Sequence, residues 1–152
     1  MLAVDSRAAE IVEVRPEDLP AWIPAAEFCY AESQMPGRFD PAHWLECWTT
    51  LIEQGRGVVF GVPDRVILGG VLSRSMNTGE LSCCESFWAT AQGGAGYGAF
   101  LMARLEAWGR ERGATILAAN AMTHFAGCGR LEKLLRLLGF RRYEVAYLKE
   151  LR

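Results

Sequence analysis

One stretch, LSCCESFWAT-AQGGAGYG-AFLMARLEAW, covers residues 81–108 and carries most of the information about the fold. Its first ten residues are rich in strand-forming types and predict a strand over residues 81–90. Four glycines then fall within the six residues 93–98, and apolar residues at helical spacing follow. Glycine permits close approach of a bulky anion, and the start of a helix presents unpaired N–H groups. The stretch therefore predicts a pyrophosphate-binding loop between a strand and a helix.

The rest of the chain predicts a single mixed α/β domain over residues 1–152. Strands are expected at residues 11–15, 58–62, 66–76, 115–119 and 142–148, in addition to 81–90. Helices are expected after Asp18, from the Asp40-Pro41 start to Gly55, over the run that ends at Gly113, and over residues 131–138. Turn residues join three consecutive strands, so the sheet should be mainly antiparallel, with about four helices around it.

Composition excludes several classes of protein. The 152 residues are 51% hydrophobic and 22% charged, with a net charge of −2. We therefore expect no nucleic-acid partner and no anionic membrane surface. No apolar run is long enough to cross a bilayer, and the first ten residues are too polar for a secretory signal. The five scattered cysteines form no metal-like pattern, so we expect reduced thiols, a cytoplasmic protein and no metal.

The glycine loop also matches the dinucleotide pattern G-x-G-x-x-A over residues 94–99. That fingerprint needs an acidic residue about 20 residues further on, at the end of the next strand, to hold a ribose. The strand at 115–119 is followed by Asn120, with no acid near it. A nicotinamide dinucleotide is therefore not expected.

The same residues are similar to the acetyl-CoA motif of the GNAT N-acetyltransferases. That motif is a strand, a G-x-G turn, a helix patterned L-L-x-x-L-E-x-W, then R-G-A and a short strand. In this chain it reads Gly96-Tyr97-Gly98, Leu101-Met102, Leu105-Glu106-Ala107-Trp108 and Arg112-Gly113-Ala114, and Leu138-Gly139-Phe140 resembles the closing L-G-F motif. The short chain, with Phe28-Cys29-Tyr30-Ala31-Glu32-Ser33 early and Phe87-Trp88 before the loop, looks most like small GNAT proteins of bacteriophages and prophages.

The resemblance implies a sheet that splays open at an acetyl-CoA site. The pantetheine arm would pair with the backbone of Trp88, Ala89 and Thr90 in the manner of an added strand. The pyrophosphate would lie against Gly93, Gly94, Ala95, Gly96, Tyr97, Gly98 and Ala99. A small-molecule or protein amine would attack the thioester directly, without an enzyme nucleophile.

For the general base, the resemblance points to Glu85, on the strand that leads to the loop. His124, in the loop after the next strand, is the second candidate. Three family positions differ here, and one of them is Cys128, which stands where the family has an asparagine. Gly93 or Ala95 stands where the family has arginine or glutamine, and Leu135 stands where a tyrosine protonates the departing thiolate. The alternative is a GNAT-fold binding or structural module, weakly active or inactive. A homodimer is an open alternative.

Strict alternation along the strand at 81–90 predicts which side chains share a face. One face should carry Glu85, Phe87 and Ala89, and the other Ser86, Trp88 and Thr90. A bulge near the splay would change this assignment.

Overall fold

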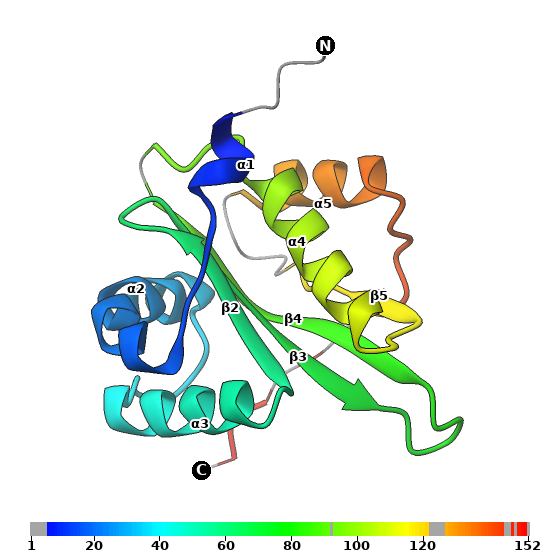
Figure 1. The fold of residues 1–152 in the computed structure, drawn as a ribbon, viewed down its shortest axis with the longest axis horizontal. Coiled ribbons are helices and arrows are strands. Elements are labelled where there is room, and N and C mark those ends of the chain that lie inside the picture. Colours follow the sequence, from blue (N-terminus) through cyan, green and yellow to red (C-terminus); the bar gives the residue numbers. More distant parts are fainter. Residues whose placement is uncertain (1–5, 92, 122–126, 145–146, 148, 152) are drawn as a thin grey trace.

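The computed structural model describes residues 6–91, 93–121, 127–144, 147 and 149–151. One five-stranded sheet separates two groups of helices (Figure 1). The elements, in chain order, are α1 (Ser6–Glu10), β1 (Val12–Glu13), a 3-10 helix (Pro16–Trp22), α2 (Ile23–Ser33), α3 (Pro41–Glu53), β2 (Gly57–Val62), β3 (Val66–Arg74), β4 (Leu81–Thr90), α4 (Gly98–Glu111), β5 (Ile116–Ala118) and α5 (Cys128–Leu137). The expected mixed α/β fold is confirmed.

The strand order in the sheet follows the chain, β1-β2-β3-β4-β5. The first four strands are antiparallel neighbours, because short turns join β2 to β3 and β3 to β4. Asp64 in the first of these turns has a left-handed φ of 59°, which an Asp tolerates better than most residues. β5 lies parallel to β4 after the crossover through α4. The sheet is thus mainly antiparallel with one parallel edge.

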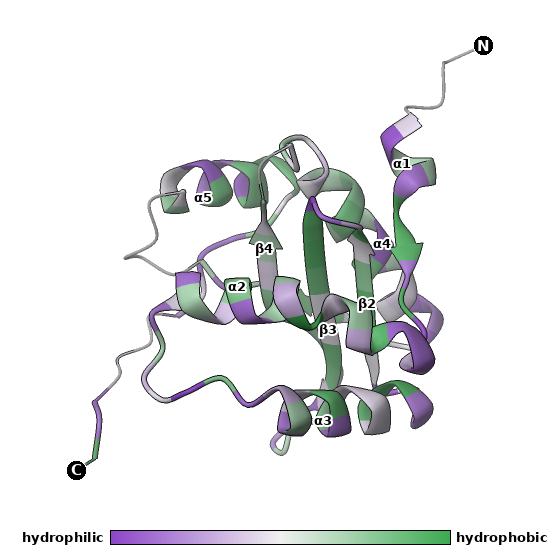
Figure 2. Cartoon of the chain, turned by 90° about the vertical axis from the view of Figure 1, so that its left-hand side faces the viewer, coloured by the Kyte–Doolittle hydropathy of each residue, from purple (hydrophilic) through white to green (hydrophobic). Residues whose placement is uncertain are grey.

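The sheet has a separate hydrophobic core on each face. β2 is buried along its whole length, which is why it reads as a continuous apolar run, and it lies in the hydrophobic centre of the molecule (Figure 2). Successive residues of β2 and β3 point to opposite faces. The α4 and α5 face contains Val58, Phe60, Leu68, Leu101, Met102 and Leu105. The α2 and α3 face contains Leu19, Trp48, Val59 and Ile67.

Two expected strands differ in the structure, and one helix is present that was not expected. The first strand is shorter than residues 11–15, and α1 precedes it where no helix was expected. The strand expected at 142–148 is wrong for its described residues, 142–144 and 147, which are in no strand. Tyr143 and Tyr147 would share one face of such a strand, but they are exposed, at 86% and 94%. No strand among the described residues lies beside them to pair with. Among the described helices, none is long and apolar enough to cross a membrane.

Candidate active site

β4 carries a bulge that changes which of its side chains share a face. Gly69 of β3 pairs with Phe87, but the next residue, Gly70, pairs with Glu85, so Ser86 is an extra residue in β4. A bulge of one residue shifts the alternation beyond it. The expectation of one face with Glu85, Phe87 and Ala89 is therefore wrong. Glu85 and Trp88 both lie on the α4 side, because their partners Gly70 and Leu68 face the core there.

β4 and β5 separate at Glu85. Their parallel pairing covers Ser82 to Cys84 on β4 and Ile116 to Ala118 on β5. Two residues beyond β5, Asn120 bonds to Glu85 in place of a continued ladder. Its backbone N–H donates to Glu85 Oε2 at 2.9 Å, and its side-chain Nδ2 donates to the Glu85 carbonyl oxygen at 3.2 Å. Residues 85–90 of β4 then continue without a strand partner on this side among the described residues.

Glu85 is the one charged side chain in the buried part of the described chain, at 6% exposure. Burial removes water from the carboxylate and raises its pKa to about 7, while the hydrogen bonds from Asn120 act in the opposite direction. A carboxyl group with a pKa near neutrality is half ionised at the pH where an amine must lose a proton. This pKa suits proton transfer near neutral pH, and the role of Glu85 as a general base stays a prediction.

The glycine loop joins the far end of β4 to α4. Gly93 and Gly96 have φ values of 83° and 92°, a conformation that side chains disfavour, and both are exposed. The first intrahelical bond of α4 runs from the Leu101 N–H to the Tyr97 carbonyl at 2.9 Å. The N–H groups of residues 98–100 precede that bond, so they and the helix dipole are directed at the loop. This arrangement fits an anion held by backbone amides.

The other two glycines of the loop, Gly94 and Gly98, lie where neighbouring atoms leave no room for a side chain. A Cβ at Gly94 would overlap the Arg65 carbonyl oxygen, and a Cβ at Gly98 would lie 2.9 Å from both Trp88 and Leu134. Gly98 is needed because α4 starts against the Trp88 ring and α5.

The three strand residues expected to bind pantetheine differ in exposure. Ala89 is buried at 8%, Thr90 is exposed and Trp88 is half-buried. The Trp88 indole Nε1 is buried without a hydrogen-bond partner among the described residues. A buried donor without a partner costs free energy. A bound acceptor group would therefore be stabilised at this N–H, beside the glycine loop. A small recess here is lined by Phe28, Glu32, Trp88, Ala89 and Thr90.

The structure describes Leu135 but not His124, the other two positions that the sequence singled out. Leu135 is 8% exposed and belongs to the core on the α4 side, so it supplies no proton to a leaving group. His124 lies outside the described residues, and its role as a second base stays a prediction. Among the described residues, no cluster of three or more metal-ligating side chains occurs.

Tyr97 belongs to a polar cluster that the sequence did not suggest. Its side chain is 3% exposed and turns inward from the loop. The hydroxyl donates to Glu10 Oε2 at 2.6 Å and accepts from Arg65 Nη1 at 2.8 Å, and the Arg65–Glu10 ion pair closes the triangle at 3.1 Å. Glu10 and Tyr97 are 87 residues apart in sequence. This cluster fixes the loop to α1 and to the β2–β3 turn.

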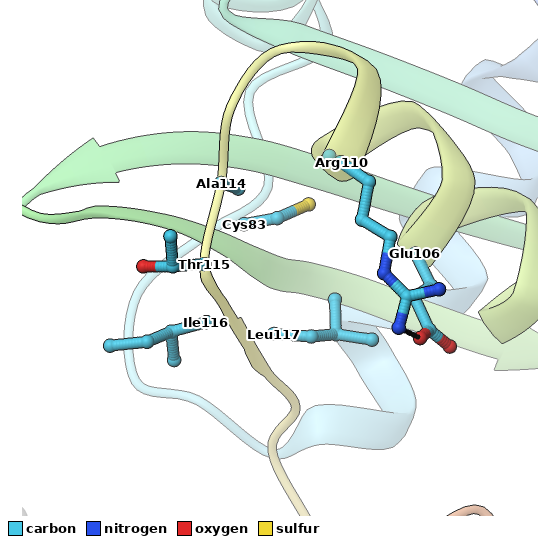
Figure 3. A pocket seen from close by; sticks show the side chains of 8 residues that line it. Cys83, Glu106, Arg110, Ala114, Thr115, Ile116 and Leu117 are labelled. Atoms are coloured by element: carbon cyan, nitrogen blue, oxygen red, sulfur yellow. Dashed lines mark ion pairs between the residues drawn. The ribbon is translucent and has the colours of Figure 1, made fainter.

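A larger recess lies between the C-terminal end of α4 and β5 (Figure 3). Its lining includes Glu106 and Arg110 near the C-terminal end of α4, together with Cys83 and residues 114–117 around β5. It is at the opposite end of α4 from the glycine loop. The ion pair of Glu106 and Arg110 already satisfies the charges there. We place the candidate site at the glycine loop, because an arm that binds as an added strand needs a free strand edge.

Comparison with solved structures gives acetyltransferases over nearly the whole chain. A protein from Clostridium acetobutylicum, solved as a predicted acetyltransferase with acetyl-CoA, has a TM-score of 0.70 and 11% identity, covering 91% of this chain and 94% of that one. An aminoglycoside acetyltransferase from an uncultured soil sample, in complex with sisomicin, has a TM-score of 0.69 and 16% identity, covering 93% and 95%. A ribosomal-protein-alanine N-acetyltransferase from Brucella melitensis biovar Abortus has a TM-score of 0.65 and 17% identity, covering 97% and 100%.

The chain has the GNAT acetyltransferase fold. No protein-family model matches it, and no curated protein sequence matches it. Identities of this size are evidence for the fold and leave the chemistry to be argued from the site. The resemblance to phage proteins and the homodimer stay predictions.

Proposed function

We propose that this chain is an acetyl-CoA-dependent N-acetyltransferase. The observation that carries the proposal is the separation of β4 from β5 at the buried Glu85, with the free edge of β4 leading into the glycine loop. The acetyltransferase structures with the same fold support it, one of them solved with acetyl-CoA. The orphaned Trp88 Nε1 and the open amides at the start of α4 fit a ligand with acceptor groups.

Acetyl-CoA would be held by backbone groups of this chain. The free edge of residues 88–90 would pair with the amide groups of the pantetheine arm. The loop from Gly93 to Ala99 and the first amides of α4 would hold the pyrophosphate. When bound, acetyl-CoA supplies a thioester whose carbonyl carbon is open to attack by an amine.

Glu85 would accept a proton from the incoming amine, directly or through one water. Asn120 keeps the carboxylate in place, because its N–H donates to Glu85 Oε2. As the new C–N bond forms and the C–S bond breaks, the departing thiolate takes its proton from water, since Leu135 offers none. His124 is the second candidate for the base.

The acceptor amine would enter by the recess beside the end of β4. Phe28 and Glu32 of α2 line this recess together with β4 residues. A carboxylate and an aromatic ring favour a cationic amine that brings an apolar part. Two similar structures are named for amine substrates, an aminoglycoside and a ribosomal-protein alanine, and this is consistent with an amine acceptor.

The test is titration calorimetry with acetyl-CoA, followed by a thiol-release assay over a panel of small-molecule and peptide amines. We expect saturable binding, no binding of NADH, and release of thiol that depends on an amine. Glu85→Gln should reduce kcat about 10²- to 10⁴-fold and leave acetyl-CoA affinity nearly unchanged. Binding without any transfer would favour the binding-module alternative, and absence of binding would refute the proposal.

A further inference from the structure

The N-terminal helix α1 is fixed beside the glycine loop (Figure 1). Glu10, at its end, is bonded to Tyr97 and Arg65, as described above. Arg104 of α4 donates to the Ala8 carbonyl oxygen at 3.5 Å. Contacts to the glycine loop, to the β2–β3 turn and to α4 hold this short helix, so its side chains have defined positions relative to the loop.

Arg7 of α1 reaches the loop itself. A Cβ at Gly96 would overlap Arg7 Nη1, so the guanidinium lies directly against the loop backbone. The Arg7 Cζ atom is 5.5 Å from the centre of the Phe100 ring, within the range of a cation–π contact. Phe100 is in the first turn of α4. The guanidinium is therefore held at the open N-terminal end of this helix.

The loop has no cation of its own. Residues 75–103 contain neither lysine nor arginine. Arg65 contacts the loop through the hydroxyl of Tyr97, whose side chain is buried. Arg7 is the cationic side chain that the structure places against the exposed loop residue Gly96.

We propose that Arg7 binds the pyrophosphate of acetyl-CoA and takes the place of the missing arginine or glutamine of the loop. This inference rests on the proposed function. An arginine presents several N–H donors in a fixed plane, which suits bonds to phosphate oxygens. The glycine at position 96 then has a second use, because it lets the guanidinium and a phosphate approach the same backbone.

The experiment compares acetyl-CoA dissociation constants by calorimetry for the natural chain and for Arg7→Gln, Arg7→Lys and Arg110→Gln. Arg110 is the matched control, since it removes the same charge at the opposite end of α4. We expect Arg7→Gln to weaken binding about tenfold, because Arg7 is half-buried and a charged hydrogen bond is lost. Arg7→Lys should be intermediate, and Arg110→Gln should have nearly natural affinity.

Two further measurements specify the contact. Dephospho-CoA lacks the 3′-phosphate, so the loss with Arg7→Gln should persist with this ligand if Arg7 binds the pyrophosphate. Added salt should weaken binding more steeply in the natural chain than in Arg7→Gln, because an ionic contact is screened. Circular dichroism and the unfolding temperature check that the variants are folded.

The outcomes separate this inference from the proposed function. If the natural chain does not bind acetyl-CoA, the proposed function fails. If it binds and Arg7→Gln binds equally well or more tightly, the proposed function stands and the role of Arg7 is refuted. A loss that disappears with dephospho-CoA would assign Arg7 to the 3′-phosphate and would also refute the inference as stated.

Discussion

Replacing Glu85 with glutamine should make the protein more stable above neutral pH, although it removes the proposed base. The pKa of Glu85 rises from the ordinary glutamate range to about 7 because the carboxylate is buried. Between pH 4.5 and 7 the native state keeps a proton that the unfolded state has lost, so stability falls as the pH rises through this window. Each pKa unit corresponds to about 1.4 kcal/mol, so the ionised carboxylate costs about 3 kcal/mol above pH 7.

The assay is urea unfolding of the natural chain and of Glu85→Gln at pH 4.5, 6, 7 and 8.5. The free energy of unfolding of the natural chain, taken relative to the variant, should fall by about 3 kcal/mol across the series and level off above pH 7. Other titrating groups cancel in this difference. Glu53→Gln is the matched control, since Glu53 is exposed on α3. A difference that does not change with pH would refute a buried, proton-holding Glu85.

Further predictions concern the neighbours of Glu85 and the loop. Asn120→Ala keeps the backbone N–H bond to Glu85 Oε2 but removes the side-chain hydrogen bond, which lowers the pKa of Glu85. The pKa of Glu85 should therefore rise above 7, and the acid limb of the rate profile should move to higher pH. Gly98→Val should lower the unfolding temperature, because a side chain there overpacks Trp88 at a cost of about 1–3 kcal/mol. Tyr97→Phe should reduce the free energy of unfolding by about 1 kcal/mol, measured in urea, through the loss of two hydrogen bonds.

Local signals in the sequence predicted most of the elements correctly. Asp40 does cap α3, where its carboxylate accepts from the N–H groups of Ala42 and His43 at 3.0 and 3.1 Å. The glycine loop falls between β4 and α4 as its spacing indicated. These features depend on residues close together in the chain, and helix caps and turns are set by such residues.

The features that the sequence did not predict depend on contacts between distant segments. The bulge at Ser86 arises from the register of β4 against β3, and no residue type in LSCCESFWAT marks it. Asn120 becomes a partner of Glu85 only because the crossover through α4 returns the chain beside β4. Arg7 reaches Gly96 through tertiary packing of α1, a helix too short to be predicted from periodicity.

The claim that acetyl-CoA binds along the free edge of β4 and the glycine loop is tested most directly by amide hydrogen exchange with and without saturating acetyl-CoA. New hydrogen bonds and exclusion of water should slow exchange in residues 88–90 and 93–100 together, and NADH should change neither segment. Protection confined to the recess around Arg110 and β5, or protection of neither segment under saturating ligand, would contradict the account.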